Sequence, residues 1–269
     1  MSRNQRADKP AKADKASKTH TPADTGAGAN TAPEAPARLT ARELKALTAL
    51  DTPTICNALE VVAPQRRLYG YTTEPLRCVY PDLPPIVGYA RTGTIRATQP
   101  SVRDAQSDRE TRIGWYRYVD TGPKPGIVVL QDLDGERAGY GSFWGEVNSH
   151  IHRGLGCLGV VTNGSIRDIP MNASGFQMLA GSVMPSHAHV HVVEIGVSVT
   201  VCGMAVADGD LIHADQHGAV VIPHAVAPLI IAAAKMLTRR EAVIIGAAKR
   251  KGFGWQTLKA AFDEAADIH

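Results

Sequence analysis

The stretch Gly145–Pro170, GEVNSHIHRGLGCLGVVTNGSIRDIP, decides the fold. It predicts a helix that opens at Gly145, a glycine turn, and a buried strand over Leu158–Thr162, which is an apolar run bounded by glycines. A polar loop over Asn163–Asp168 is predicted to follow that strand. The first turn of the helix offers unpaired backbone N–H groups, and such groups attract an anion.

Arg167 and Asp168 close this stretch with a cation and a carboxylate side by side. A helix N-terminus, an arginine and an aspartate at one end of a strand would form a site for a metal ion and a small carboxylic acid. The alternative is a solvated pair of charges in a loop, because charged neighbours are common in loops. The spacing by itself leaves both interpretations open.

Gly145-Glu146 is followed, after twenty residues, by Arg167-Asp168, and the segment that ends in this pair is Gly164–Asp168 (GSIRD). This pattern resembles that of the regulator of ribonuclease activity A superfamily. Within that superfamily the chain is most similar to the metal-dependent 4-hydroxy-4-methyl-2-oxoglutarate and 4-carboxy-4-hydroxy-2-oxoadipate aldolases. Two downstream segments also match, Val206–Leu211 (VADGDL) and Ala214–Pro223 (ADQHGAVVIP). Asp208 stands where the family usually has proline. The resemblance extends over about Leu39–Gly252.

The resemblance implies a swivelling β/β/α domain that forms homotrimers or homohexamers with sites at subunit interfaces. The residues themselves predict an α/β fold with a mixed central sheet and C-terminal helices, because short strands and βα-like units alternate. Residues 39–269 are predicted to form a single aldolase-like domain with a C-terminal helical extension. Residues 1–38 have no aliphatic side chain larger than alanine, and we expect them to be a disordered tail.

Carried over position by position, the resemblance implies a divalent metal, Mg²⁺ or Mn²⁺, with Asp168 as its direct protein ligand. Glu146 would hold a metal-bound water or transfer a proton, and Arg167 would contact the keto oxygen and carboxylate of a 2-oxo acid. The implied carboxylate-binding backbone amides are those of Gly145, Glu146, Val147 and Asn148. Glu241 lies where the family places a glutamate that reaches the neighbouring subunit's site; the alternative is an exposed helix residue.

The implied reaction is retro-aldol cleavage of a 4-hydroxy-2-oxo acid to pyruvate. A water held by Glu146 or Glu241 would take the 4-hydroxyl proton, and the metal and Arg167 would stabilise the enolate oxygen. Decarboxylation of oxaloacetate is an expected side activity, because it passes through the same enolate. A Schiff-base aldolase is disfavoured, since no lysine lies between Lys124 and Lys235.

Two alternatives remain open from the sequence. Some members of the superfamily bind and inhibit a ribonuclease without a metal, but these tend to lack the aspartate that Asp168 supplies here. The other alternative is a metal-dependent lyase for a different acid on the same scaffold. The segment Thr98–Tyr118, the histidines after Ser186 and Asp208 depart from the common aldolase pattern, and they affect the identity of the substrate more than the type of reaction.

Further elements follow from local patterns. Thr40 and Glu43 form a capping box, and Thr52 is predicted to cap a second helix that runs to Leu59. Val87–Ala97 alternates like a strand, and Pro170–Ala180 is predicted to be a short helix. The remaining predicted strands and helices are Pro125–Leu130, Val197–Val201, Met204–Val206, Leu211–Ala214, Ala219–Ile222, and C-terminal helices broken at Gly252–Gly254.

Two charged segments are additional candidates. Thr98–Tyr118 could be a helix or a flap over a site. Its candidates for binding a second substrate carboxylate are Arg103, Arg109 and Arg112, and the alternative is a solvated face. Histidines His187, His189 and His191 would share one face of a strand and could chelate zinc or iron, or form a polar face at a subunit contact.

Composition excludes several classes of function. No apolar run approaches the roughly 20 residues of a membrane span. Residues 1–38 hold seven basic and four acidic residues, and the rest of the chain has 22 of each sign, so the net charge gives no nucleic-acid footprint. The four cysteines are far apart in the sequence, and we interpret them as reduced core thiols of a cytoplasmic protein.

Overall fold

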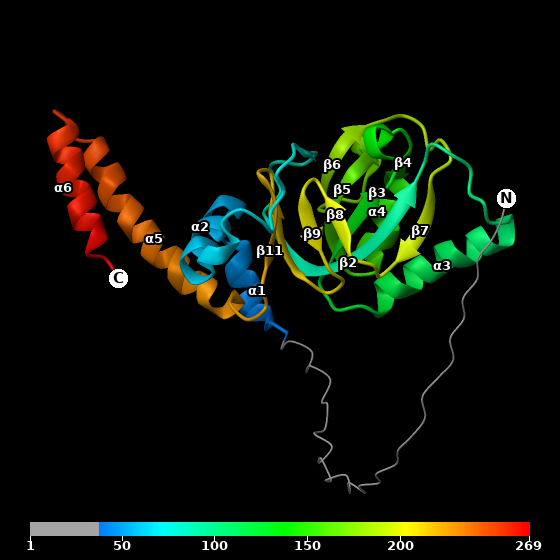
Figure 1. The fold of residues 1–269 in the computed structure, drawn as a ribbon, viewed down its shortest axis with the longest axis horizontal. Helices are drawn as coiled ribbons and strands as arrows, with labels where there is room; N and C mark the ends of the chain where they lie inside the picture. Colours follow the sequence, from blue (N-terminus) through cyan, green and yellow to red (C-terminus); the bar gives the residue numbers. More distant parts are fainter. Residues whose placement is uncertain (1–37) are drawn as a thin grey trace, which may run out of the picture. The chain divides into compact units, whose positions relative to one another are not determined.

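The computed structural model describes residues 38–269. Within them, a mixed sheet of nine strands forms the centre of the fold (Figure 1). Its strands are β1 (Arg77–Cys78), β2 (Ile86–Arg96), β3 (Gly126–Asp132), β4 (Ser142–Trp144), β5 (Cys157–Ile166), β6 (Gln177–Val183), β7 (His191–Ile195), β10 (Leu211–Asp215) and β11 (Gly218–Ile222). The predicted disordered tail, residues 1–38, lies outside the described residues except for Arg38.

The strands follow the order β1-β6-β5-β3-β2-β10-β11, with β4 beside β5 and β7 beside β2. The inner strands β2, β3, β5 and β6 run parallel. The outer strands β1, β7 and β10 are antiparallel to their neighbours, as is β11 to β10. The predicted α/β fold with a mixed central sheet and C-terminal helices is therefore confirmed.

Strand β3 shows why this sheet is covered on both faces. Ile127 and Val129 pack into a core with the small second sheet, which is formed by β8 (Val199–Val201) and β9 (Met204–Val206). Val128 and Leu130 point to the opposite face and pack with Trp115 and other aromatic residues. Because side chains alternate along a strand, a continuous apolar run is what a strand buried on both faces requires.

Six α-helices accompany this sheet in the described residues. They are α1 (Ala41–Thr48), α2 (Thr52–Val62), α3 (Ala105–Thr121), α4 (Glu146–Gly154), α5 (Ala227–Ala248) and α6 (Trp255–Ala266). Helices α1, α2 and α5 share a core with β2, β10 and β11, and α3 packs along β7 (Figure 1). Helix α6 packs on α5 after the predicted break, where Gly252 takes φ 79. A positive φ of this kind favours glycine.

Several predicted elements differ from the observed ones. Helix α2 is capped by Asp51, whose carboxylate accepts a hydrogen bond from the Thr54 N–H, so Thr52 is the first helical residue. The predicted loop after Thr162 is wrong up to Ile166, because β5 continues to that residue between β4 and β6.

The predicted helix Pro170–Ala180 is also wrong. A single 3-10 turn spans Ile169–Met171, and the chain then enters β6. Met178, Leu179 and Ala180 are buried, because β6 pairs in parallel with β5 and both of its faces are covered. An apolar run this short does not distinguish a strand from a buried helix.

Two other predicted elements are confirmed. The capping box of Thr40 and Glu43 is present at the start of α1, and the predicted strand Val87–Ala97 agrees with β2 to within one residue. The four cysteines are unpaired, and each is buried or half-buried. None of the helices between residues 38 and 269 is long and apolar enough to cross a membrane.

Candidate functional site

A cavity of about 630 Å³ lies where α3, the start of α4, the end of β5 and the segment before β7 meet. Of the predicted site residues, Gly145, Val147, Asn148, Arg167 and Asp168 line this cavity. Glu146 is exposed on the first turn of α4 and is not among the lining residues. Glu241 is an exposed residue of α5 and does not line it either.

Asp168 follows β5 in a left-handed backbone conformation, with φ 52 and ψ 36. Among residues with a side chain, aspartate and asparagine tolerate this region best. The preceding Arg167 donates its backbone N–H to the Trp144 carbonyl at 2.9 Å, which ties the end of β5 to the strand that leads into α4. This turn directs the Asp168 side chain toward the start of α4.

The Asp168 carboxylate occupies the position of a helix cap. Its Oδ2 accepts the Glu146 N–H at 3.3 Å and lies 3.2 Å from Arg167 Nε. Gly145, the N-cap residue, has no side chain to cap the helix itself. Arg167 and Asp168 are each about 28% exposed, so the pair lies at the cavity wall and keeps contact with water. The predicted pairing of a helix N-terminus, an arginine and an aspartate is present in this geometry.

Gly145 makes that approach possible. Its φ is −174, which any residue can adopt, so its backbone does not require glycine. A Cβ at this position would lie 2.6 Å from Asp168 Oδ2 and 3.1 Å from Arg167 Cγ. The absence of a side chain at Gly145 therefore leaves room for the carboxylate beside the helix N-terminus.

A buried polar network fixes α4 to α3. Trp115 Nε1 donates to His152 Nε2 at 2.8 Å, and His152 Nδ1 donates to the Asn148 carbonyl at 2.7 Å. Tyr116 donates its hydroxyl to Asn148 Oδ1 at 2.8 Å. Burial lowers the pKa of His152 to about 4, so the ring is neutral at pH 7. The sequence carries no signal for the role of His152, because its spacing from Asn148 is that of any helical neighbour.

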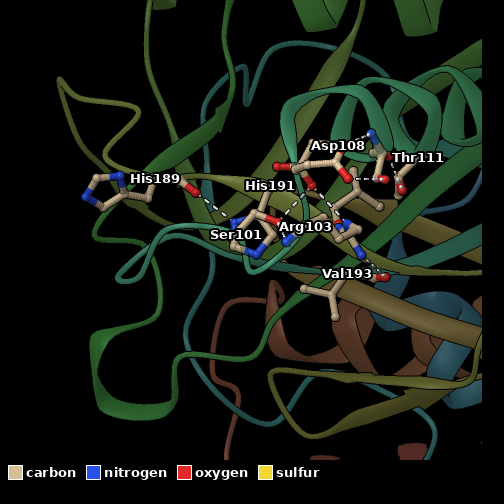
Figure 2. Close-up of polar contacts among 10 residues, drawn as sticks. Ser101, Arg103, Asp108, Thr111, His189, His191 and Val193 are labelled. Atoms are coloured by element: carbon tan, nitrogen blue, oxygen red, sulfur yellow. Dashed lines mark hydrogen bonds and ion pairs between the residues drawn. The ribbon is translucent and has the colours of Figure 1, made fainter.

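The three candidate arginines of the segment before and within α3 separate into two groups. Arg109 and Arg112 line the cavity. Arg103 instead pairs with Asp108, at 2.8 Å between Nε and Oδ1, and donates to the carbonyls of Val192 and Val193 (Figure 2). Thr98–Tyr118 is thus a loop that continues into α3, and the helix itself forms one wall of the cavity.

The histidines do not form the predicted chelate. His187–Val190 is a turn in which Ala188 has φ 46, and β7 begins at His191. His187 and His191 line the cavity, while His189 points away from Arg103 and Asp108 (Figure 2). Between residues 38 and 269, no three His, Cys, Asp or Glu side chains are arranged to hold a metal ion together. The prediction that the three histidines share a strand face is wrong, because the chain reverses between them.

Two carboxylates line the cavity, and that of Asp108 pairs with Arg103. Beside the N-terminus of α4, a divalent cation would find the carboxylate of Asp168. Mg²⁺ and Mn²⁺ are hard cations that take oxygen ligands, and Mg²⁺ keeps several of its waters when one or two carboxylates bind it. The room beside Oδ2 that Gly145 provides suits this donor set. It does not suit zinc in a structural site, which takes four nitrogen or sulfur ligands.

Comparisons with known proteins agree with the architecture. The family described as RraA-like, Aldolase/RraA, matches residues 52–221. An uncharacterized protein of Methanocaldococcus jannaschii is 32% identical over 115 residues, which are 42% of this chain and 55% of that relative. The match thus spans about half the length of this curated relative.

Two solved structures have the same fold. An uncharacterized protein from Pseudomonas syringae pv. tomato superposes with a TM-score of 0.64 at 22% identity, covering 86% of this chain and 98% of that one. Streptomyces coelicolor RraAS2, described as an unusual member of the RNase ES inhibitor RraA protein family, gives a TM-score of 0.60 at 20% identity and covers 76% and 96%. At these identities the likeness is one of fold.

Proposed function

The chain belongs to the RraA-like family, Aldolase/RraA, and from this premise we propose that it is a divalent-metal-dependent aldolase. It cleaves a 4-hydroxy-2-oxo acid to pyruvate and decarboxylates oxaloacetate as a side activity. The observation that carries the proposal is the Asp168 carboxylate, held beside Arg167 at the N-terminus of α4 on the wall of a cavity. This arrangement combines a ligand for a hard cation with two kinds of anion-binding group.

In this proposal Asp168 would hold Mg²⁺ or Mn²⁺, and the bound ion would supply positive charge that favours enolate formation. Arg167 pairs with Asp168 through Nε and donates from Nη1 to the Pro185 carbonyl at 3.4 Å. Its Nη2 and the second hydrogen of Nη1 remain for the keto oxygen and carboxylate of the 2-oxo acid. The backbone amides of Val147 and Asn148, at the positive end of α4, favour the same carboxylate. Of these two groups, Arg167 acts at the keto oxygen, where negative charge develops during cleavage, and the amides orient the carboxylate.

The proton from the 4-hydroxyl needs an acceptor. Glu146 is exposed on the first turn of α4, next to Asp168, and can hold a water at the mouth of the cavity. Glu241 is exposed on α5 and would act only in the site of a neighbouring subunit. We therefore propose a homotrimer or homohexamer with sites at its interfaces, in which Glu146 and Glu241 from different subunits share this role.

The test is release of pyruvate from 4-hydroxy-4-methyl-2-oxoglutarate and from oxaloacetate, coupled to lactate dehydrogenase. With Mg²⁺ or Mn²⁺ we expect turnover of both substrates. Excess EDTA should abolish that turnover, and added metal should restore it, because Asp168 supplies the metal site. A rate that is the same with metal and with EDTA would contradict the proposal.

The other functions leave different signatures in the same experiment. A metal-dependent lyase for another acid would bind Mn²⁺ without releasing pyruvate from either substrate. A ribonuclease inhibitor, the function for which the family of the Streptomyces protein is named, would show neither turnover nor Mn²⁺ binding. Titration with Mn²⁺, followed by electron paramagnetic resonance, therefore accompanies the assay.

Gly145→Ala should lower kcat/KM about 100-fold while the melting temperature stays within about 2 °C. The new Cβ would lie 2.6 Å from Asp168 Oδ2 and must displace the carboxylate, and a displacement of about 1 Å costs about that factor in rate. The matched control is Gly154→Ala at the other end of α4, where a Cβ meets no atom within 4 Å among the described residues. Equal activity of the two variants would show that the Asp168 position is not critical.

A further inference from the structure

We propose that Arg109 and Arg112 of α3 determine which acid the cavity accepts, by binding a carboxylate at the end of the ligand remote from its keto group. The effect of the two arginines on the reaction rests on the proposed function, whereas their binding of a carboxylate does not. It assigns α3, whose segment departs from the common aldolase pattern, to substrate selection.

The first observation is the face that α3 presents. Ala105, Arg109, Arg112 and Tyr116 line the cavity, and their spacing of four, three and four residues places them in one row along the helix. Trp115 and Val119, on the adjoining face, are completely buried in the core. The helix therefore cannot rotate to release the arginines without exposing a tryptophan.

The second observation is the set of contacts that hold α3 against α4, whose N-terminus lies beside Asp168. Trp115 donates to His152 and Tyr116 donates to Asn148, so two consecutive residues of α3 hold α4. Further along α3, the Arg91 guanidinium lies 3.6 Å from the Tyr118 ring centre and pairs with Asp208 at 2.8 Å. Asp208, which replaces the usual proline, thus helps to hold α3 in place. These contacts set the arginines at a defined position relative to Asp168.

The third observation is the charge balance of the cavity. Asp108 also lines it, but its carboxylate accepts from Arg103 Nε and from the Ser101 hydroxyl, each at 2.8 Å (Figure 2). Asp168 is paired with Arg167. Within residues 38–269, neither Arg109 nor Arg112 has a carboxylate within 4.0 Å. Two adjacent cations on one helix face repel each other, and an anion between them removes that cost.

These observations define the ligand by its chemistry. One wall of the cavity, at Arg167 and the N-terminus of α4, suits the 2-oxo acid end. The α3 wall of the same cavity carries two guanidinium groups that have no carboxylate partner among residues 38–269, and guanidinium binds a carboxylate through paired hydrogen bonds. The ligand is therefore a small acid that carries a carboxylate at each end.

The test compares two ligands of equal length that lack a 4-hydroxyl and cannot undergo retro-aldol cleavage. 2-Oxoglutarate has a distal carboxylate, and 2-oxopentanoate has a methyl group in its place. Calorimetric titration with Mg²⁺ present should show that the unmodified protein binds 2-oxoglutarate about 10- to 100-fold more tightly, as expected for charged hydrogen bonds. The variant Arg109→Gln/Arg112→Gln should lose this preference and keep its affinity for 2-oxopentanoate.

Arg117→Gln is the matched control. Arg117 is an exposed arginine of the same helix that does not line the cavity. Its replacement removes one positive charge from α3, as each of the other two replacements does, but leaves the cavity unchanged. This variant should keep the full preference for 2-oxoglutarate. Equal affinity of the unmodified protein for both ligands, including no binding of either, would overturn the inference, as would a double variant that retains the preference.

A second arm separates this inference from the proposed function. Pyruvate release is measured from two substrates. One is 4-hydroxy-2-oxopentanoate, and the other is 4-hydroxy-2-oxoglutarate, which has a carboxylate in place of the terminal methyl group. The double variant should raise KM about 10-fold or more for the diacid alone, with kcat little changed. If no pyruvate is released but calorimetry shows the expected loss of preference, the aldolase proposal fails and the two-ended acid site stands. Turnover with an unchanged KM for the diacid would overturn the site.

Discussion

Replacing Asp168 with asparagine should lower kcat/KM for pyruvate release about a thousand-fold, the largest effect that we expect from a single substitution. Asparagine tolerates the left-handed conformation at this position, and its side-chain oxygen can still accept the Glu146 N–H. The substitution therefore removes the negative charge that binds the metal and leaves the local backbone intact. Steady-state kinetics at saturating Mg²⁺ measures the loss.

Two further measurements locate the cause of that loss. The melting temperature of Asp168→Asn should match that of the unmodified protein, while its affinity for Mn²⁺ should fall in parallel with activity. Asp263→Asn serves as the control, because Asp263 is an exposed residue of α6 that pairs only with Lys259 in the described part of the chain. Activity of Asp168→Asn within a few-fold of the unmodified protein would remove Asp168 from the proposed metal site.

Acidification should destabilise the fold through His152. The pKa of this ring is lowered by burial from 6.5 to about 4 in the folded protein, so protonation favours the unfolded chain. The stabilisation is complete above pH 6.5 and is lost as the pH falls toward 4. That shift corresponds to about 3 kcal/mol in the free energy of unfolding. Urea unfolding at pH 7.5 and at pH 4.5 measures most of this difference.

The variant His152→Gln separates the contribution of His152 to the pH dependence of stability from that of other titratable groups. Glutamine keeps one donor and one acceptor but does not titrate, so the variant should be less stable at pH 7.5 and should show a weaker loss on acidification. Some pH dependence should remain, because burial also lowers the pKa of His213. His189→Gln is the control, since His189 is exposed. An unchanged pH dependence in His152→Gln would show that His152 does not couple folding to protonation.

Elements with local signals were predictable. The capping box of Thr40 and Glu43, the apolar run of β3 and the glycine that opens α4 each depend on neighbours within one turn or one strand. The paired charges of Arg167 and Asp168 were identified by their spacing from Gly145. Elements whose state depends on distant partners were not predictable, as β6 shows: its seven residues become a strand because β5 lies beside them.

The site divides in the same way. The sequence by itself determined the chemical groups: a carboxylate and a guanidinium after a buried strand, a helix N-terminus without a capping side chain, and three arginines near α3. Only the tertiary structure decided which groups meet. It turns Asp168 into a left-handed conformation against Gly145, assigns Arg103 to Asp108, and leaves Arg109 and Arg112 facing the cavity. The physical reason is that hydrogen bonds and ion pairs form between atoms within about 3 to 4 Å, and chain spacing does not set that distance across separate elements.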